Sequence, residues 1–143
     1  MTLRVGFLAL LVGCTGDNLS SNNTNKDEGF EEEVDESAPL IEHEPIDGTQ
    51  TFGVDVPIEA LVTDEGTGVL FVYLHYKNEV DGEADWTRLL LAATEGVYSG
   101  KIKGSDMRGG GVDYYIEATD YAQNPAFAPE DGGDDPYHFR IAE

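Results

Sequence analysis

Acidic and amide side chains that follow two alternating segments are the residues best suited to hold an ion. Asp64 follows the segment 54–62, and Asp120 and Asn124 follow the segment 112–119. Calcium takes about six to eight oxygen ligands from carboxylates, amides and carbonyls, and these residue types supply them. Asp and Asn in loops also form turns by hydrogen-bonding to nearby main-chain groups. The sequence therefore leaves two interpretations open: a calcium site at Asp64, Asp120 and Asn124, or ordinary turn chemistry.

Further acids are expected near these two loops. The stretches 57–66, 69–76 and 112–120 resemble the immunoglobulin-like sandwich, and this resemblance implies that the loops after the segments 54–62 and 112–119 lie at the same end of the domain, so Asp64 is expected near Asp120. The other acids expected close to this pair are Glu65, Glu130, Asp131, Asp134 and Asp135. Because the chain has 29 acidic residues, clusters of this kind also arise by chance.

Aromatic side chains alternate with apolar ones in the segment 69–76 and form the second candidate site. The apolar positions, expected to face the core, are Leu70, Val72, Leu74 and Tyr76. The outward-facing positions, joined by one from the segment 112–119, are Phe71, Tyr73, His75 and Tyr115. Rigid rings on the outside of a sheet suit the binding of a protein or a glycan. The same rings also stabilise a sheet by packing across neighbouring strands, so both interpretations stay open.

Three more residues are considered for the same outer surface. His138 and Arg140, in the segment 137–141, are expected to share it. Trp86 lies out of phase with Leu89 and Leu91. It therefore either caps an edge of the core or extends the aromatic surface.

No combination of residues points to catalysis. His43, His75 and His138 lie in no spacing that suits a metal site. No glycine-rich loop precedes a helical segment, and accidental carboxylate pairs are expected in so acidic a chain. The sequence therefore predicts a protein that is not an enzyme.

The first residues have the features of a secretory signal peptide. A short positive start precedes the apolar segment 5–12, which as a helix spans roughly 12 Å against a hydrocarbon core of roughly 30 Å. The end of this segment, Leu11-Val12-Gly13-Cys14, resembles the lipobox of bacterial lipoproteins. The resemblance implies cleavage before Cys14, lipid attachment to its thiol and anchoring in a bacterial cell envelope.

The segment 14–37 is expected to be a disordered acidic tether. Its Gly, Ser, Asn and clustered Asp and Glu residues do not bury enough apolar surface to fold, and no period of 2 or 3.6 is sustained. By resemblance to other lipoproteins, Thr15 after the cysteine favours the outer membrane, and the periplasmic or surface side is left open. The predicted parts are a signal peptide at 1–13, the lipidated tether at 14–37 and a folded domain at 38–143.

From residue 38 onward, short apolar runs of period 2 recur between clusters of Gly, Asp and Asn. Seven strands are expected, at 40–46, 54–62, 69–76, 86–91, 97–102, 112–119 and 137–141. Pro57 cannot donate a ladder hydrogen bond, so its strand is unpaired or bulged on one side there. No stretch carries helical periodicity. The pattern predicts an all-β domain, an antiparallel two-sheet sandwich.

Three stretches resemble the bacterial immunoglobulin-like and fibronectin type III-like modules. They are PIEALVTDEG at 57–66, VLFVYLHY at 69–76 and VDYYIEATD at 112–120. The resemblance implies an immunoglobulin-like β-sandwich, and it is silent on function because this fold hosts many unrelated activities. Gln123, where such modules more often carry glycine, and the acidic stretch 129–136 depart from the pattern.

The net charge of −21 restricts the partners. So negative a chain repels phosphate backbones, and nucleic acid is not an expected partner. The expected function is a non-enzymatic, lipid-anchored module of the cell envelope that binds an unknown protein or glycan. The alternatives are a structural spacer lipoprotein without a ligand and a calcium-stabilised surface module; calcium is the one cofactor considered.

Overall fold

The computed structural model describes residues 31–83 and 85–142. The predicted signal peptide, the predicted lipidation site at Cys14 and most of the predicted tether lie outside these residues. Within the described part of the chain, no helix is long and apolar enough to cross a membrane. The described residues from Leu40 onward form an all-β domain, as the alternating segments predict.

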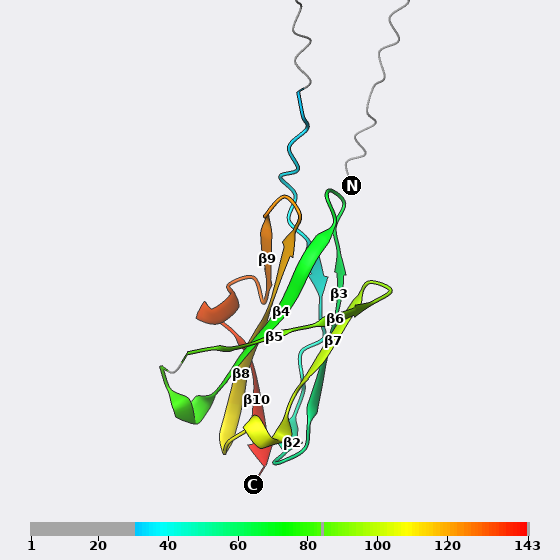
Figure 1. Cartoon of the computed structure of the whole chain (residues 1–143). Helices are drawn as coiled ribbons and strands as arrows, with labels where there is room; N and C mark the ends of the chain where they lie inside the picture. The colour runs from blue at the N-terminus through cyan, green and yellow to red at the C-terminus, as the bar shows by residue number, and fades with distance from the viewer. Residues whose placement is uncertain (1–30, 84, 143) are drawn as a thin grey trace, which may run out of the picture. The chain divides into compact units, whose positions relative to one another are not determined.

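Two sheets build the domain (Figure 1). The first sheet has, in order, β1 (Leu40–Glu42), β3 (Val56–Thr63), β7 (Val97–Ile102) and β6 (Ala92–Thr94). The second has β2 (Thr49–Thr51), β10 (Tyr137–Ala142), β8 (Gly110–Asp120), β4 (Val69–Asn78) and β5 (Thr87–Leu90), with β9 (Pro125–Ala128) also paired to β8. Three short 3₁₀ helices lie between strands: η1 (Glu79–Asp81), η2 (Gly104–Asp106) and η3 (Gly132–Asp134). The prediction of an all-β, two-sheet domain is confirmed.

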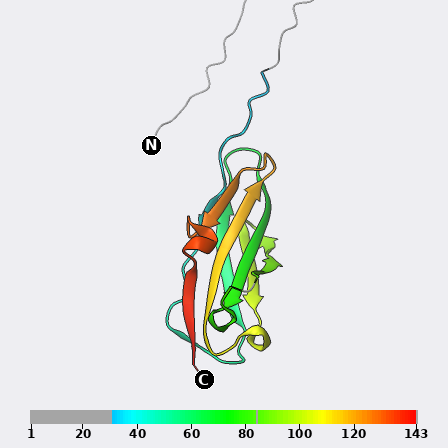
Figure 2. The same cartoon turned by 90° about the vertical axis from the view of Figure 1, so that its left-hand side faces the viewer.

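The long strands β4 and β8 form the centre of the second sheet. Figure 2 shows β9 and β10 alongside β8, and β4 pairs with the opposite side of β8. Tyr115 of β8 is directly opposite His75 of β4, and His75 is directly opposite Arg88 of β5. Because directly opposed residues of antiparallel strands share a face, this register brings side chains from three strands to one outer surface.

The described residues form ten strands where the sequence predicts seven. The predicted strand 40–46 is shorter in the structure, where β1 ends at Glu42. Pro45, in the remaining part, has no N–H for a ladder hydrogen bond. The chain then crosses to the other sheet, where β2 pairs in parallel with β10. The prediction of antiparallel pairing throughout is therefore wrong for this one pair. The strands β6 and β9 were also not predicted; they are only three and four residues long.

The core lies between the sheets and follows the predicted alternation with two exceptions. In β3, the residues at alternate positions are buried: Val56, Ile58, Ala60 and Val62. Val54, the first apolar position of the segment predicted as the strand 54–62, is exposed because the strand begins only at Val56. Leu70, also predicted to face the core, is 37 % exposed because a bulge shifts the register between Val69 and Phe71.

A buried tyrosine joins the two sheets. Tyr114 is fully buried, and its hydroxyl oxygen accepts a hydrogen bond from the Ile46 N–H at 2.9 Å. His43 Nδ1 lies 2.7 Å from the Glu59 carbonyl oxygen, to which it donates, so Nε2 is free to accept from the Tyr114 hydroxyl at 3.0 Å. Burial lowers the pKa of His43, which favours the neutral ring that this chain of hydrogen bonds requires. The contacts fix the crossing segment 43–46 against β8.

Candidate functional site

Six aromatic rings form a continuous row on the outer face of the second sheet. We call this set the aromatic row: Phe71, Tyr73, His75, Tyr115, Trp86 and Phe127. Successive ring centroids are 4.9 Å apart for Phe71 and Tyr73, 6.4 Å for Tyr73 and His75, and 4.4 Å for His75 and Tyr115. Beyond Tyr115 the row divides, with Trp86 at 4.9 Å and Phe127 at 6.3 Å. Phe71, Tyr73, His75 and Tyr115, predicted for the outer face, therefore follow one another along one surface. Of the two further residues expected there, His138 lies 2.7 Å from an Asp113 carboxylate oxygen and Arg140 is exposed.

His75 and Tyr115 hold the centre of the row. Their rings are stacked with an interplanar angle of 4°. His75 Nε2 also lies 2.6 Å from a carboxylate oxygen of Glu117. Burial and the nearby Glu117 charge raise the pKa of Tyr115, so its phenol stays neutral at physiological pH. His75 itself is only 9 % exposed, so it supports the neighbouring rings more than it offers a surface.

Two cationic side chains cover ring faces of the row. The Arg88 guanidinium lies 4.5 Å from the Tyr73 ring centroid, and the Lys77 ammonium lies 4.6 Å from that of Trp86. The Lys77 contact and the contact with Tyr115 put Trp86 in the aromatic surface, one of the two positions that the sequence leaves open. They also leave few flat ring faces free, which matters for the kind of ligand that fits here.

A cavity of about 390 Å³ lies at the end of the row beside η3. It is lined by Tyr115, Phe127, Glu130, Asp131, Gly132, Gly133 and Asp134. Phe127 is 41 % exposed, and the loop at Gly133 approaches the rings of both Tyr115 and Trp86. The lining thus combines two aromatic residues with three acidic ones. Sequence reasoning expected these acids near Asp64 and Asp120, and the structure places them against Tyr115 and Phe127 instead.

The predicted ion site is a second cluster, at one end of the domain. Asp35, Asp64 and Asp120 each place a carboxylate oxygen within 4.8 Å of those of the other two. Asp64 and Asp120 were predicted, whereas Asp35 lies in the predicted tether. The one signal for Asp35 in the sequence is Ser37 two residues later, the spacing of a local Asp turn.

Asn124 positions this cluster as a hydrogen-bond donor. Its side-chain nitrogen lies 2.7 Å from Asp120 Oδ2 and 2.9 Å from the Asp35 carbonyl oxygen. Its main-chain N–H donates to Asp120 Oδ1 at 2.7 Å. The side-chain nitrogen also lies 3.3 Å from the Ser37 carbonyl oxygen, its third acceptor. Asn124, predicted as a third ion ligand, therefore lies beside the carboxylates with its amide nitrogen toward acceptors.

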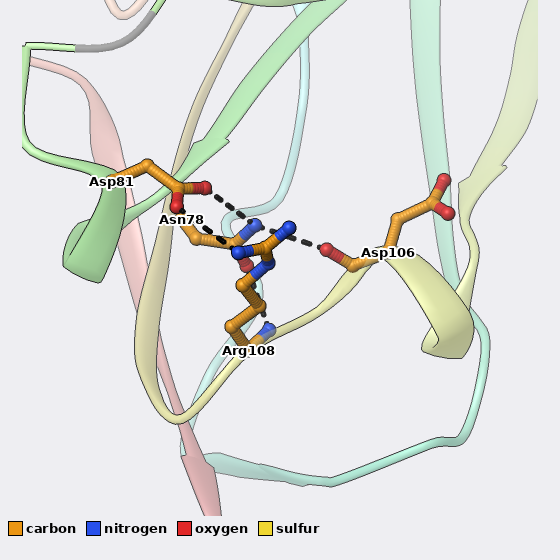
Figure 3. A network of polar contacts seen from close by, with 4 residues as sticks. All are labelled: Asn78, Asp81, Asp106 and Arg108. Carbon is orange, nitrogen blue, oxygen red and sulfur yellow. Dashed lines mark hydrogen bonds and ion pairs between the residues drawn. The ribbon is translucent and has the colours of Figure 1, made fainter.

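A polar network of four residues lies near the opposite end of β4 (Figure 3). The Asn78 amide donates to Asp81 Oδ2 at 3.2 Å and to the Asp106 carbonyl oxygen at 3.0 Å, and it accepts from the Arg108 N–H at 2.8 Å. Arg108 also lies 3.7 Å from Asp81. Because every polar atom of Asn78 has a protein partner, the network is explained by its role in holding η1 and η2 to β4.

Comparison with known proteins leaves the assignment to the structure. No family model matches the chain. No curated protein matches it either.

Proposed function

We propose that this chain is a non-enzymatic binding module of a bacterial cell envelope, anchored by lipid at Cys14 in the outer membrane. In this proposal the two sheets form an immunoglobulin-like sandwich, and the aromatic row is the surface that a protein partner contacts. The observation that carries it is the pocket at the end of the row, where Tyr115 and Phe127 meet Glu130, Asp131 and Asp134.

The chemistry of the pocket favours a cationic side chain of a protein partner. Lys and Arg bind both to aromatic faces and to carboxylates. Tyr115 is already stacked on His75, so the ring that this pocket offers beside its three acidic residues is that of Phe127, which is 41 % exposed. The net charge of −21 adds long-range attraction to a basic partner. Stacking of a sugar requires open ring faces, and Arg88, Lys77 and His75 already cover those of Tyr73, Trp86 and Tyr115. A basic protein surface is therefore a better fit than a glycan.

Trp86 reports binding at this site, because it is the only tryptophan of the chain and contacts Tyr115. We expect octalysine peptide to change the Trp86 fluorescence saturably, and the same peptide with acetylated side chains to leave it unchanged. Glu130→Gln with Asp134→Asn should weaken octalysine binding roughly tenfold, since two charge-assisted contacts are lost.

The matched control is Glu42→Gln with Glu59→Gln, which removes the same charge from exposed positions of the first sheet. It should change the affinity less than about threefold, through the net charge alone. Equal weakening in both double variants would contradict a localised pocket. A response to neutral oligosaccharides alone would instead identify a glycan-binding surface, and no response to any probe would favour a spacer without a ligand.

A further inference from the structure

The acidic cluster brings together three negative charges from distant parts of the chain. Asp35 precedes β1, Asp64 follows β3, and Asp120 ends β8. Asp120 is fully buried, and no ion pair joins any of the three to a cationic side chain within residues 31–83 and 85–142. Carboxylates this close repel one another, and buried charges in proteins are normally paired or bound to a metal.

Local hydrogen bonds account for most of the carboxylate oxygens, with one exception. Asp35 Oδ2 accepts from the Thr67 N–H at 2.6 Å, and Asp64 Oδ2 accepts from the N–H groups of Gly66 at 3.1 Å and Gly68 at 2.6 Å. The Ser37 hydroxyl, the Thr67 N–H and the Ser37 N–H lower the pKa of Asp35 and favour its charged form. The Oδ1 atom of Asp64 is buried and has no hydrogen-bond partner.

This orphaned oxygen is a second observation that points to a ligand. A buried acceptor without a donor costs free energy unless another group satisfies it, and a cation does so for an ionised carboxylate. The Asn124 amide nitrogen, a side-chain donor of this cluster, is already shared among Asp120 and two carbonyl oxygens. An unsatisfied oxygen on one of three neighbouring carboxylates fits a positive ion.

We propose that Asp35, Asp64 and Asp120 bind one calcium ion, which fastens the segment before β1 to this end of the domain. The donors are all oxygens, and no Cys or His takes part, which matches hard cations. Calcium tolerates irregular arrangements of carboxylates and water better than magnesium, which requires near-octahedral geometry. The site does not involve the aromatic row and goes beyond the proposed binding function.

Gly66 provides a variant that leaves every carboxylate in place. A Cβ atom at Gly66 would overlap the Asp35 carboxylate, so Gly66→Ala should displace Asp35 without changing the charge. Asp35→Asn removes the charge without adding bulk. If Asp35 is a ligand, both variants should weaken binding by a similar factor, about tenfold or more. Glu42→Gln is the matched control, because it removes one exposed negative charge that belongs to a different part of the surface.

The test is isothermal titration of the metal-free protein with calcium chloride, together with thermal unfolding in chelator and in about 2 mM calcium. We expect one ion per chain, a rise in Tm of roughly 5 to 15 °C, and a smaller rise with magnesium. The double variant Asp64→Asn with Asp120→Asn should abolish both the heat and the rise, whereas Glu42→Gln should keep both. Calcium should also slow cleavage by a glutamate-specific protease after Glu36.

Three results would overturn the proposal. The first is the absence of saturable calcium binding to the unaltered protein. The second is binding that Asp35→Asn, Gly66→Ala and Glu42→Gln weaken equally, because that would indicate general charge attraction. The third is unchanged cleavage after Glu36 when calcium is bound, because the segment before β1 would then not be fastened by the ion.

Discussion

Tyr114→Ala should lower the free energy of unfolding by about 3 to 5 kcal/mol, the usual cost of removing a buried aromatic ring. Tyr114 is fully buried in β8, and its ring lies 5.3 Å from that of Tyr137 and 5.9 Å from that of Phe139. Its hydroxyl also holds the segment that crosses between the sheets, through Ile46 and His43. For a domain of this size, the loss corresponds to a fall in Tm of roughly 15 to 30 °C.

Two further variants separate the ring from the hydroxyl. Tyr114→Phe keeps the ring but leaves the Ile46 N–H without its acceptor, so we expect a smaller loss of about 1 to 3 kcal/mol. Tyr121→Ala removes an exposed tyrosine and should change stability by less than about 0.5 kcal/mol. Chemical unfolding followed by circular dichroism measures all three. A loss below 1 kcal/mol for Tyr114→Ala would show that the two sheets are not joined here.

The domain should lose stability steeply between pH 10 and pH 12, the range set by the ordinary tyrosine pKa and the raised values in the fold. Burial raises the pKa of Tyr76 to about 12, helped by the hydrogen bond that its hydroxyl donates to Asp106. Burial also raises the pKa of Tyr114 to about 12. An unfolded tyrosine ionises near pH 10, so in this range the unfolded chain releases protons that the folded chain retains.

This contribution is fully present below about pH 10 and is lost as the pH rises toward 12. Raising a tyrosine pKa from 10 to about 12 corresponds to roughly 2 to 3 kcal/mol of folding free energy, or about 5 kcal/mol for the two tyrosines together. Denaturant unfolding at a series of pH values, with tyrosinate absorbance, measures the loss. The double variant Tyr76→Phe with Tyr114→Phe should start from a lower stability and lose less of it. Equal slopes for the two proteins would contradict this assignment.

The sequence predicts the long strands well because their alternation is strong. The predicted segment 97–102 has the same bounds as β7. In β3, buried and exposed residues alternate along the whole strand. β9 was missed because it begins at Pro125 and has only four residues, so no period is visible. The exposure of Leu70 was missed for a different reason: a bulge is a pairing irregularity between two strands, and the pattern of one strand does not encode it.

The candidate sites were predictable to the extent that they depend on strand phase. Alternation alone places Phe71, Tyr73 and His75 on one face. The path of the loop 129–136 depends on packing, and this is why its acids line the pocket at Tyr115 rather than the acidic cluster. Asp35 was missed because it lies in a segment whose composition indicates disorder. Its hydrogen-bond partner Thr67 is also 32 residues away in the sequence, and no local pattern predicts such a contact.

The central claim, that the aromatic row with its acidic pocket binds a basic protein surface, is tested most directly by mapping the contact. Nuclear magnetic resonance of the labelled protein, titrated with octalysine, gives a shift for each main-chain amide and for the Trp86 indole. We expect the largest saturable changes at Trp86, Tyr115 and Phe127 and in the loop at Gly132 and Gly133. The largest changes on the first sheet, near Glu42 and Glu59, would contradict the claim.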